Sequence, residues 1–189
     1  MIPLSVKEVA EASGGHVDGA DPDATVTSVI TDSRAATPGA LFVALAGEHA
    51  DGHAFARDAL GAGAVAALVR DDAREVGAAV RVRDPLAAMG ALAEFVRGRL
   101  RATTIAITGS SGKTGTKDLT AAACATERRT VAADASYNNE IGVPLTIFGA
   151  DDPPRRRRRH EHRPGAHRHV RLTRQHGDRE GRARRVAVA

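Results

Sequence analysis

The chain has 189 residues, a single cysteine and a formal net charge of +4. One cysteine excludes an intramolecular disulfide framework and is typical of a reducing compartment. The sequence has no apolar run long enough for a membrane-spanning helix, and no basic stretch followed by an apolar one near Met1, so we expect neither a membrane span nor a secretory signal. This length allows one large domain or two small ones.

The charge is concentrated at one end of the chain. After residue 152 there are 13 arginines against 3 acidic residues, whereas acidic residues outnumber basic ones before it. Residues 151–189 contain the run Arg155–Arg159 and few apolar side chains before Val186. This composition cannot bury enough apolar surface to offset the entropy of ordering, so residues 151–189 are predicted to be a disordered basic tail.

The tail resembles the translation of a GC-rich gene in a shifted reading frame, and we take a frameshifted or misassembled reading frame as a hypothesis. The alternative is a tail that binds polyanions. It lacks interleaved aromatic residues, which argues against specific binding to nucleic acid.

The first hundred residues alternate between helix and strand signals. Ser5 and Glu8 have the spacing of a capping box, and Gly14-Gly15 closes a short helix after them. Four apolar runs predict strands, and a helix is expected to begin at Phe55 and end near Gly61. The predicted strands cover residues 25–30, 41–45, 64–69 and 80–83.

A longer helix is predicted to begin at Asp84-Pro85, which supplies an N-cap and a proline at the first helical position. Its apolar stripe, expected to face a core, consists of Leu86, Met89, Ala93, Val96 and Leu100. Residues 97–102 are expected to separate two domains. Alternating strands and helices predict an α/β fold with a mostly parallel sheet.

The segment Thr104–Thr114 carries the strongest chemical signal. Its β-branched apolar run predicts a buried strand, and the glycine turn that follows leads into a helix expected to reach about Thr126, before a strand at residues 130–133. Gly109 and Gly112 would let backbone N–H groups face a phosphate, with Lys113 as a point charge and Thr114 as a hydroxyl ligand for Mg²⁺. Ile107 occupies the place of the first glycine of the usual pattern, so this loop is shorter. It nevertheless predicts a nucleotide triphosphate site.

Four segments together resemble the Mur ligase family: residues 31–34, residues 41–47 with Asp51-Gly52-His53, residues 108–114 and residues 137–146. The resemblance covers about residues 1–150. It implies a small α/β domain that binds the UDP end of the substrate at residues 1–100. The start of a P-loop, Rossmann-like ATP-binding domain would follow at residues 103–150, before the tail at 151–189.

The resemblance implies an ATP-dependent ligase of peptidoglycan precursor synthesis. In the reaction favoured by the Ser110-Ser111 loop and the Asn138-Asn139 motif, ATP phosphorylates the terminal carboxylate of UDP-N-acetylmuramoyl-tripeptide. The amine of D-alanyl-D-alanine then attacks the acyl phosphate. Alternatives are the sibling ligase that adds the third peptide residue, and a non-catalytic fragment that binds nucleotide or UDP-sugar. The expected state is a cytoplasmic monomer.

The resemblance also assigns roles to residues. The residues that would cradle ATP are Gly109, Ser110, Ser111, Gly112, Lys113, Thr114 and Gly115. Lys113 is the catalytic candidate and Thr114 the ligand for Mg²⁺. Ser33 and Arg34 would meet the uridine end of the substrate, and Asn138 and Asn139 would lie near its diphosphate.

Each of the other assignments has a structural alternative. Asp32-Ser33 fits an Asx-type turn after a strand, and Asn138-Asn139 fits loop amides that bond their own backbone. His53 is better explained as a turn or N-cap residue than as a catalytic base. After Phe148 we recognise neither the acidic Mg²⁺ ligand nor the third domain of the family. We therefore expect little or no ligase activity from this chain.

Overall fold

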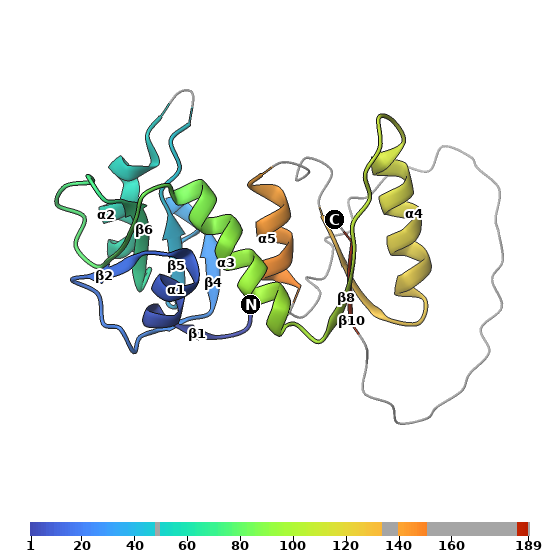
Figure 1. Ribbon diagram of the computed structural model, residues 1–189, viewed down its shortest axis with the longest axis horizontal. Coiled ribbons are helices and arrows are strands. Elements are labelled where there is room, and N and C mark those ends of the chain that lie inside the picture. Colours follow the sequence, from blue (N-terminus) through green and yellow to red (C-terminus); the bar gives the residue numbers. More distant parts are fainter. Residues whose placement is uncertain (48–49, 134–139, 151–184, 189) are drawn as a thin grey trace.

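The computed structural model describes residues 1–47, 50–133, 140–150 and 185–188. Their strands form a five-stranded sheet, a three-stranded sheet and a short antiparallel pair (Figure 1). Helix α5 lies between the two larger sheets and beside α3, which covers one face of the five-stranded sheet. No helix among the described residues has both the length and the apolarity needed to cross a membrane.

The five-stranded sheet has the order β2-β7-β6-β5-β4. Strands β4 to β7 run parallel and β2 pairs with β7 antiparallel, as expected for an α/β fold. The strands are β2 (His16–Asp18), β4 (Ser28–Ile30), β5 (Ala40–Val43), β6 (Ala66–Arg70) and β7 (Ala79–Val82). The helices beside this sheet are α1 (Val6–Ser13), η1 (Ser33–Ala35), η2 (Gly52–Phe55), α2 (Ala56–Gly61) and α3 (Pro85–Arg99).

The predicted caps of α1 and α3 are confirmed. At the start of α1 the Ser5 hydroxyl accepts from the Glu8 N–H, and the Glu8 carboxylate accepts from the Ser5 N–H. Gly14 ends this helix in the left-handed conformation that glycine adopts without strain. At the start of α3 the Asp84 carboxylate accepts from the backbone N–H groups of Leu86 and Ala87. Local sequence therefore sets both ends of α1 and the start of α3.

The single strand predicted at residues 25–30 is interrupted. Residues Thr25–Val26 (β3) pair with β1 (Leu4–Ser5), whereas β4 joins the large sheet. The backbone N–H groups of Thr27 and Ser28 both donate to the Gly39 carbonyl. When two residues of one strand face a single residue of the next, the strand has a bulge. The bulge bends the strand and lets it pass from one sheet to the other.

Apolar side chains cover both faces of the large sheet. All four residues of β5 are buried, as expected for an inner parallel strand. Leu41 and Val43 belong to the core cluster under α1 and α3, and Ala40 and Phe42 belong to the cluster on the α2 side. Successive side chains of β5 thus alternate between the two faces of the sheet, and this one strand contributes to both cores.

Helix α5 (Gly142–Gly149) completes the first core, although it lies after the predicted domain boundary. It packs against α3 and β4, and its Ile147 and Phe148 are buried in the same cluster as Leu41. Residues 1–100 therefore share their core with a helix from the segment 103–150.

The three-stranded sheet has the order β8-β10-β9, all parallel, and packs against α4. Its elements are β8 (Ala102–Ile105), α4 (Lys113–Ala125), β9 (Arg129–Ala132) and β10 (Arg185–Val188). The strand before the glycine loop was expected to be buried, but the residues of β8 are half-buried or exposed. The predicted disorder is wrong for Arg185–Val188, because pairing on both sides orders this strand; residues 151–184 and 189 lie outside the described residues.

Candidate functional site

The glycine loop lies where the sequence predicts it, between the end of β8 and the start of α4. Gly112 is the N-cap of α4 and has φ +77°, a left-handed conformation that favours glycine. An added Cβ at Gly112 or Gly115 would have no atom of the described residues within 4 Å, so these residues leave the space beside the loop open. The first N–H groups of a helix have no intrahelical acceptor, and here they are available to a ligand.

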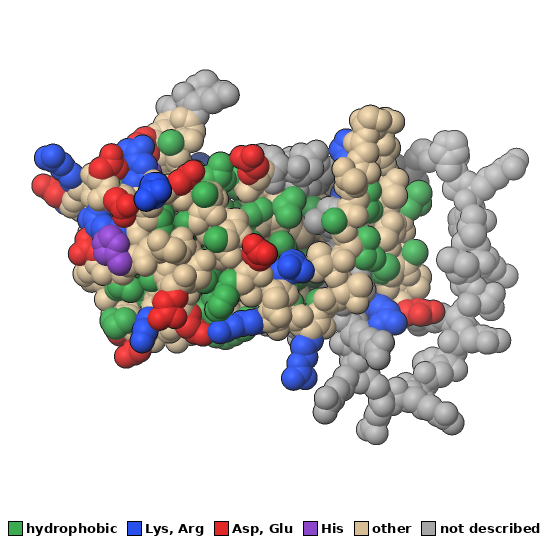
Figure 2. Space-filling view, viewed as in Figure 1, with side chains coloured by type: hydrophobic (Ala, Val, Ile, Leu, Met, Phe, Trp, Pro, Cys, Tyr) green, Lys and Arg blue, Asp and Glu red, His purple; other side chains and the backbone are tan. Residues whose placement is uncertain are grey.

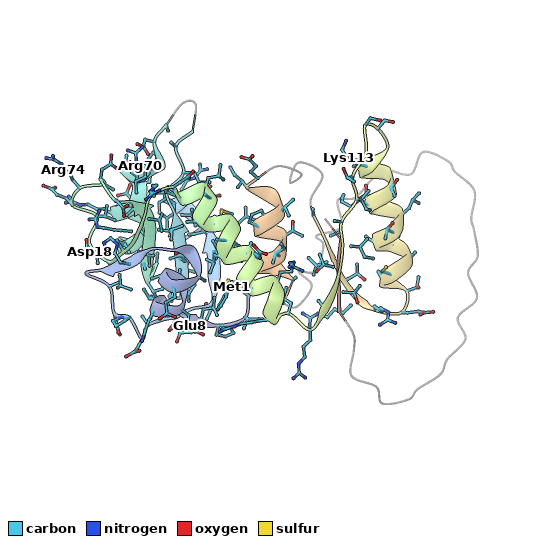
Figure 3. All side chains as sticks on the ribbon, viewed as in Figure 1. Met1, Glu8, Asp18, Arg70, Arg74 and Lys113 are labelled. Atoms are coloured by element: carbon cyan, nitrogen blue, oxygen red, sulfur yellow. The ribbon has the colours of Figure 1, made fainter. Side chains whose placement is uncertain are left out.

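The Lys113 side chain folds back over this loop. Its Nζ donates to the Gly109 carbonyl at 2.5 Å, across the four residues of the turn (Figure 3). The adjacent Thr114 and the loop residues Gly109–Gly112 are exposed. The donors at this turn are therefore backbone N–H groups, the Lys113 ammonium and the hydroxyls of Ser110, Ser111 and Thr114. This set fits a polyphosphate with a bound Mg²⁺ ion.

Lys117, which sequence reasoning missed, ties α4 to β9. Its Nζ donates to the Ala133 carbonyl at 2.6 Å and to the Asp118 carboxylate at 2.8 Å. Lys117 follows Lys113 by one helical turn, so both side chains lie on one face of α4. That spacing was the available sequence signal. The contact fixes the carboxyl end of β9 beside the helix that begins at the glycine loop.

A second group of predicted residues follows β4. Asp32 caps the short helix η1, accepting from the Arg34 backbone N–H at 3.0 Å, which is the Asx-type turn that the sequence allowed. The Arg34 guanidinium also pairs with Asp32 through its Nε and a terminal nitrogen, while 88% of its side chain remains exposed. Ser33 is the first residue of η1. The turn is therefore held by its own residues and presents a preformed ion pair to solvent.

The ion pair predicts an acid-shifted carboxyl group. The Arg34 side chain, followed by its backbone N–H, lowers the pKa of Asp32 to about 2 from an ordinary 3.8. Because the pKa is lower in the folded chain, the stabilisation is complete above the unfolded value and is lost as pH falls toward 2. We expect the Asp32 carboxyl ¹³C resonance to titrate near pH 2, and to move toward 3.8 in Arg34→Gln. A midpoint near 3.8 in the wild type would contradict the pair.

His53 has the structural role that the sequence favoured. The backbone N–H of His53 donates to the Asp51 carboxylate, and Asp51 caps η2. The His53 Nε2 accepts from the Arg70 backbone N–H at 3.0 Å, and its Nδ1 lies 2.5 Å from Asp51 Oδ1. The His53 backbone N–H, followed by its imidazole, lowers the pKa of Asp51. Both ring nitrogens are engaged, so His53 has no free lone pair for base catalysis in this conformation.

The carboxyl ends of parallel strands bring these turns to common edges. The Asp32 turn follows β4 and the loop at 44–52 follows the neighbouring strand β5. In Figure 1 the described ends of this loop, the start of α5 and the glycine loop all lie at the upper side of the molecule, and Figure 3 places Lys113 there. Asn138 and Asn139 lie outside the described residues. Among the described residues no cluster of three metal-ligating side chains occurs.

A hollow of about 860 Å³ lies between α3 and α5. Leu86, Ala93, Val143, Pro144 and Ile147 give it an apolar floor, and its charged residues are Asp84, Glu94, Arg97 and Glu140. Neither the glycine loop nor the Asp32 turn lines this hollow. Figure 2 shows apolar side chains exposed in the middle of this face of the molecule.

Known proteins match this chain in sequence. Residues 25–100 match the family model described as "Mur ligase family, catalytic domain". The UDP-N-acetylmuramoyl-tripeptide–D-alanyl-D-alanine ligase of Escherichia coli strain K12 is 41% identical over 148 residues, covering 78% of this chain and 32% of that protein. The enzyme of the same name from Mycobacterium tuberculosis strain H37Rv is 41% identical over 180 residues, covering 79% and 35%.

Solved structures match it in fold. A crystal structure of MurF from Acinetobacter baumannii has a TM-score of 0.70 at 30% identity, covering 77% of this chain and 33% of that one. MurF ligase from Thermotoga maritima, in complex with ADP, has a TM-score of 0.58 at 30% identity, covering 65% and 29%. This chain spans about a third of the length of the relatives that it matches. Sequence and fold together place the chain in the Mur ligase family.

Proposed function

We propose that residues 1–150 are the substrate- and ATP-binding part of a ligase that joins D-alanyl-D-alanine to UDP-N-acetylmuramoyl-tripeptide. The observation that carries the proposal is the glycine loop at the start of α4, with Lys113 folded over it. A relative of the same fold was crystallised with ADP. The names of the relatives favour this reaction over that of the sibling ligase that adds the third peptide residue.

Two binding regions follow from the proposal. Residues 103–150 would hold ATP, with the N–H groups of Gly109–Gly115 around its phosphates and the Lys113 ammonium neutralising the β- and γ-phosphates. Residues 1–100 would hold the UDP end of the substrate at Ser33 and Arg34, and Asn138 and Asn139 would approach its diphosphate. The parallel strands of both sheets support this division, because ligands of such sheets bind outside the carboxyl ends of strands.

The Thr114 hydroxyl would bind Mg²⁺, which supplies charge neutralisation during phosphoryl transfer. The positioned amides and the ammonium of Lys113 would hold the terminal phosphate in line with the substrate carboxylate, and positioning is the main contribution that a protein makes to this reaction. Because the substrates are ATP and a UDP-linked precursor, and the chain has one cysteine, we also propose a cytoplasmic, monomeric protein.

Calorimetric titration of the 189-residue chain tests the proposal. We expect binding of one non-hydrolysable ATP analogue with Mg²⁺ and of one UDP-N-acetylmuramoyl-tripeptide per chain. UDP-N-acetylmuramoyl-dipeptide is expected to bind more weakly, and tighter binding of the dipeptide would favour the sibling reaction. Failure of both the ATP analogue and the tripeptide to bind would contradict the proposal.

Lys113→Ala should weaken binding of the ATP analogue by roughly tenfold to a hundredfold, since hydrogen bonds to charged groups contribute about 1.5–3 kcal/mol. Affinity for UDP-N-acetylmuramoyl-tripeptide should stay unchanged in the same titration. Lys7→Ala, which removes an exposed lysine on α1, is the matched control and should leave both affinities unchanged. Equal losses in the two variants would exclude Lys113 from the nucleotide site.

A further inference from the structure

We propose that His53 is a positioning residue for the UDP end of the substrate, acting through a hydrogen-bonded bridge that holds the loop after β5 in place. The His53 bridge consists of the Asp51 carboxylate, the His53 imidazole and the backbone N–H of Arg70. The inference rests on the proposed function, because it names a residue that supports one of its two binding regions.

The loop at 44–52 is closed at its base. Ala46 and Asp51 pair as in an antiparallel sheet, and the Gly52 N–H donates to the Leu45 carbonyl at 2.9 Å. A Cβ on residue 52 would lie 2.6 Å from that carbonyl oxygen, so only glycine fits this close approach. The two arms of the loop therefore meet at Leu45 and Gly52, immediately before His53.

The contacts of His53 define one tautomer. Because the Arg70 N–H donates to Nε2, that nitrogen carries no proton, and the ring proton resides on Nδ1 and is donated to Asp51. Only 12% of the His53 side chain is exposed, so water does not replace these partners freely. The neutral imidazole thus links the base of the loop to the end of β6.

The bridge and the predicted uridine-binding turn lie at the same edge of the sheet. Strands β4, β5 and β6 are parallel neighbours, so the segments that follow them lie in order along one edge of the sheet. The Asp32–Arg34 turn follows β4, the closed loop follows β5, and Arg70 ends β6. The bridge fixes the middle of these three segments to the third. The described parts of the loop, residues 44–47 and 50–52, are then held in one position while a ligand binds at the Asp32–Arg34 turn, which is the function of a positioning residue.

Three substitutions separate the two halves of the bridge. In His53→Gln the glutamine carbonyl oxygen can still accept from the Arg70 N–H. In His53→Asn the side chain is too short for that bond and keeps only the hydrogen bond to Asp51. His53→Leu removes both. Each variant of the full chain is titrated with UDP-N-acetylmuramoyl-tripeptide and with the ATP analogue, and hydrogen exchange of the Arg70 amide is measured alongside. His53→Asn serves if His53→Leu does not fold.

In His53→Leu and His53→Asn we expect affinity for the tripeptide to fall about fivefold or more, the effect of one lost hydrogen bond, with faster exchange at Arg70. His53→Gln should bind within about twofold of the wild type, and the ATP analogue should bind all forms equally. Wild-type affinity for the tripeptide in all three variants, an equal loss in His53→Gln, or a parallel loss for the ATP analogue overturns the inference. Failure of the wild type itself to bind the tripeptide overturns the binding region that the inference serves, a result distinct from any difference among variants.

Discussion

Replacing Phe148 by alanine is expected to lower the free energy of unfolding of the five-stranded sheet by about 3–5 kcal/mol. Phe148 lies after the glycine loop in sequence, yet only 3% of it is exposed and it belongs to the core cluster of β5 and α3. Removing its ring opens a cavity where α5 meets the first hundred residues. Hydrogen exchange of the β5 and β6 amides, which reports local stability strand by strand, measures the loss.

Leu119→Ala is the matched control for this substitution. Leu119 lies on α4 and is 75% exposed, so its truncation should change stability by less than about 0.5 kcal/mol. If the β5 and β6 amides exchange as in the wild type after Phe148→Ala, then α5 does not stabilise the first sheet. In that case residues 1–100 would hold their fold alone, as the division at residue 100 implies.

Features with local chemical causes were predictable from the sequence. The capping box of Ser5 and Glu8 and the Asp84-Pro85 start produce their helices through contacts within three residues. The glycine loop also follows from local sequence, because Gly112 adopts a left-handed conformation just where the helix begins. The turn at Asp32 and the cap at Asp51 also depend on contacts between near neighbours, so they too could be predicted from the sequence. The roles of Ser33 and Arg34 in binding stay predictions.

Helix α5 could not be predicted in this way. It begins at Gly142, ends at Gly149 and contains Pro144, and all three residues lower helix propensity. Pro144 is tolerated because it lies in the first turn, where a backbone N–H has no intrahelical acceptor. Burial of Ile147 and Phe148 against the first core stabilises the helix, and that contact joins segments distant in the sequence. Tertiary packing here overrides local preference.

The contacts that support the candidate site could not be predicted from the sequence for a similar reason. Lys117 bonds a carbonyl 16 residues away, and His53 bonds a backbone N–H 17 residues away. Neither residue type at those positions specifies such a partner. Sequence therefore locates the turns that would meet the ligands, whereas only the fold shows which side chains hold those turns in place.

Proline at position 186 is expected to disrupt the three-stranded sheet. Strand β10 lies between β8 and β9, with Val186 opposite Thr103 on one side and Thr130 on the other. Proline has no N–H to donate and is excluded from inner strands, so both neighbours should lose their pairing. Since β8 leads directly into the glycine loop, binding of the ATP analogue should weaken by roughly tenfold or more. Hydrogen exchange of residues 102–105 and 129–132 measures the loss of pairing.

Val186→Ile is the control, because it keeps a β-branched residue and a backbone donor in the strand. It should preserve both the exchange protection of β8 and β9 and the affinity for the ATP analogue. The β5 and β6 amides should stay protected in both variants, since the five-stranded sheet makes no pairing with β10. Unchanged protection of β8 and β9 in Val186→Pro would show that these strands find another partner, and that the basic end of the chain is dispensable for the nucleotide loop.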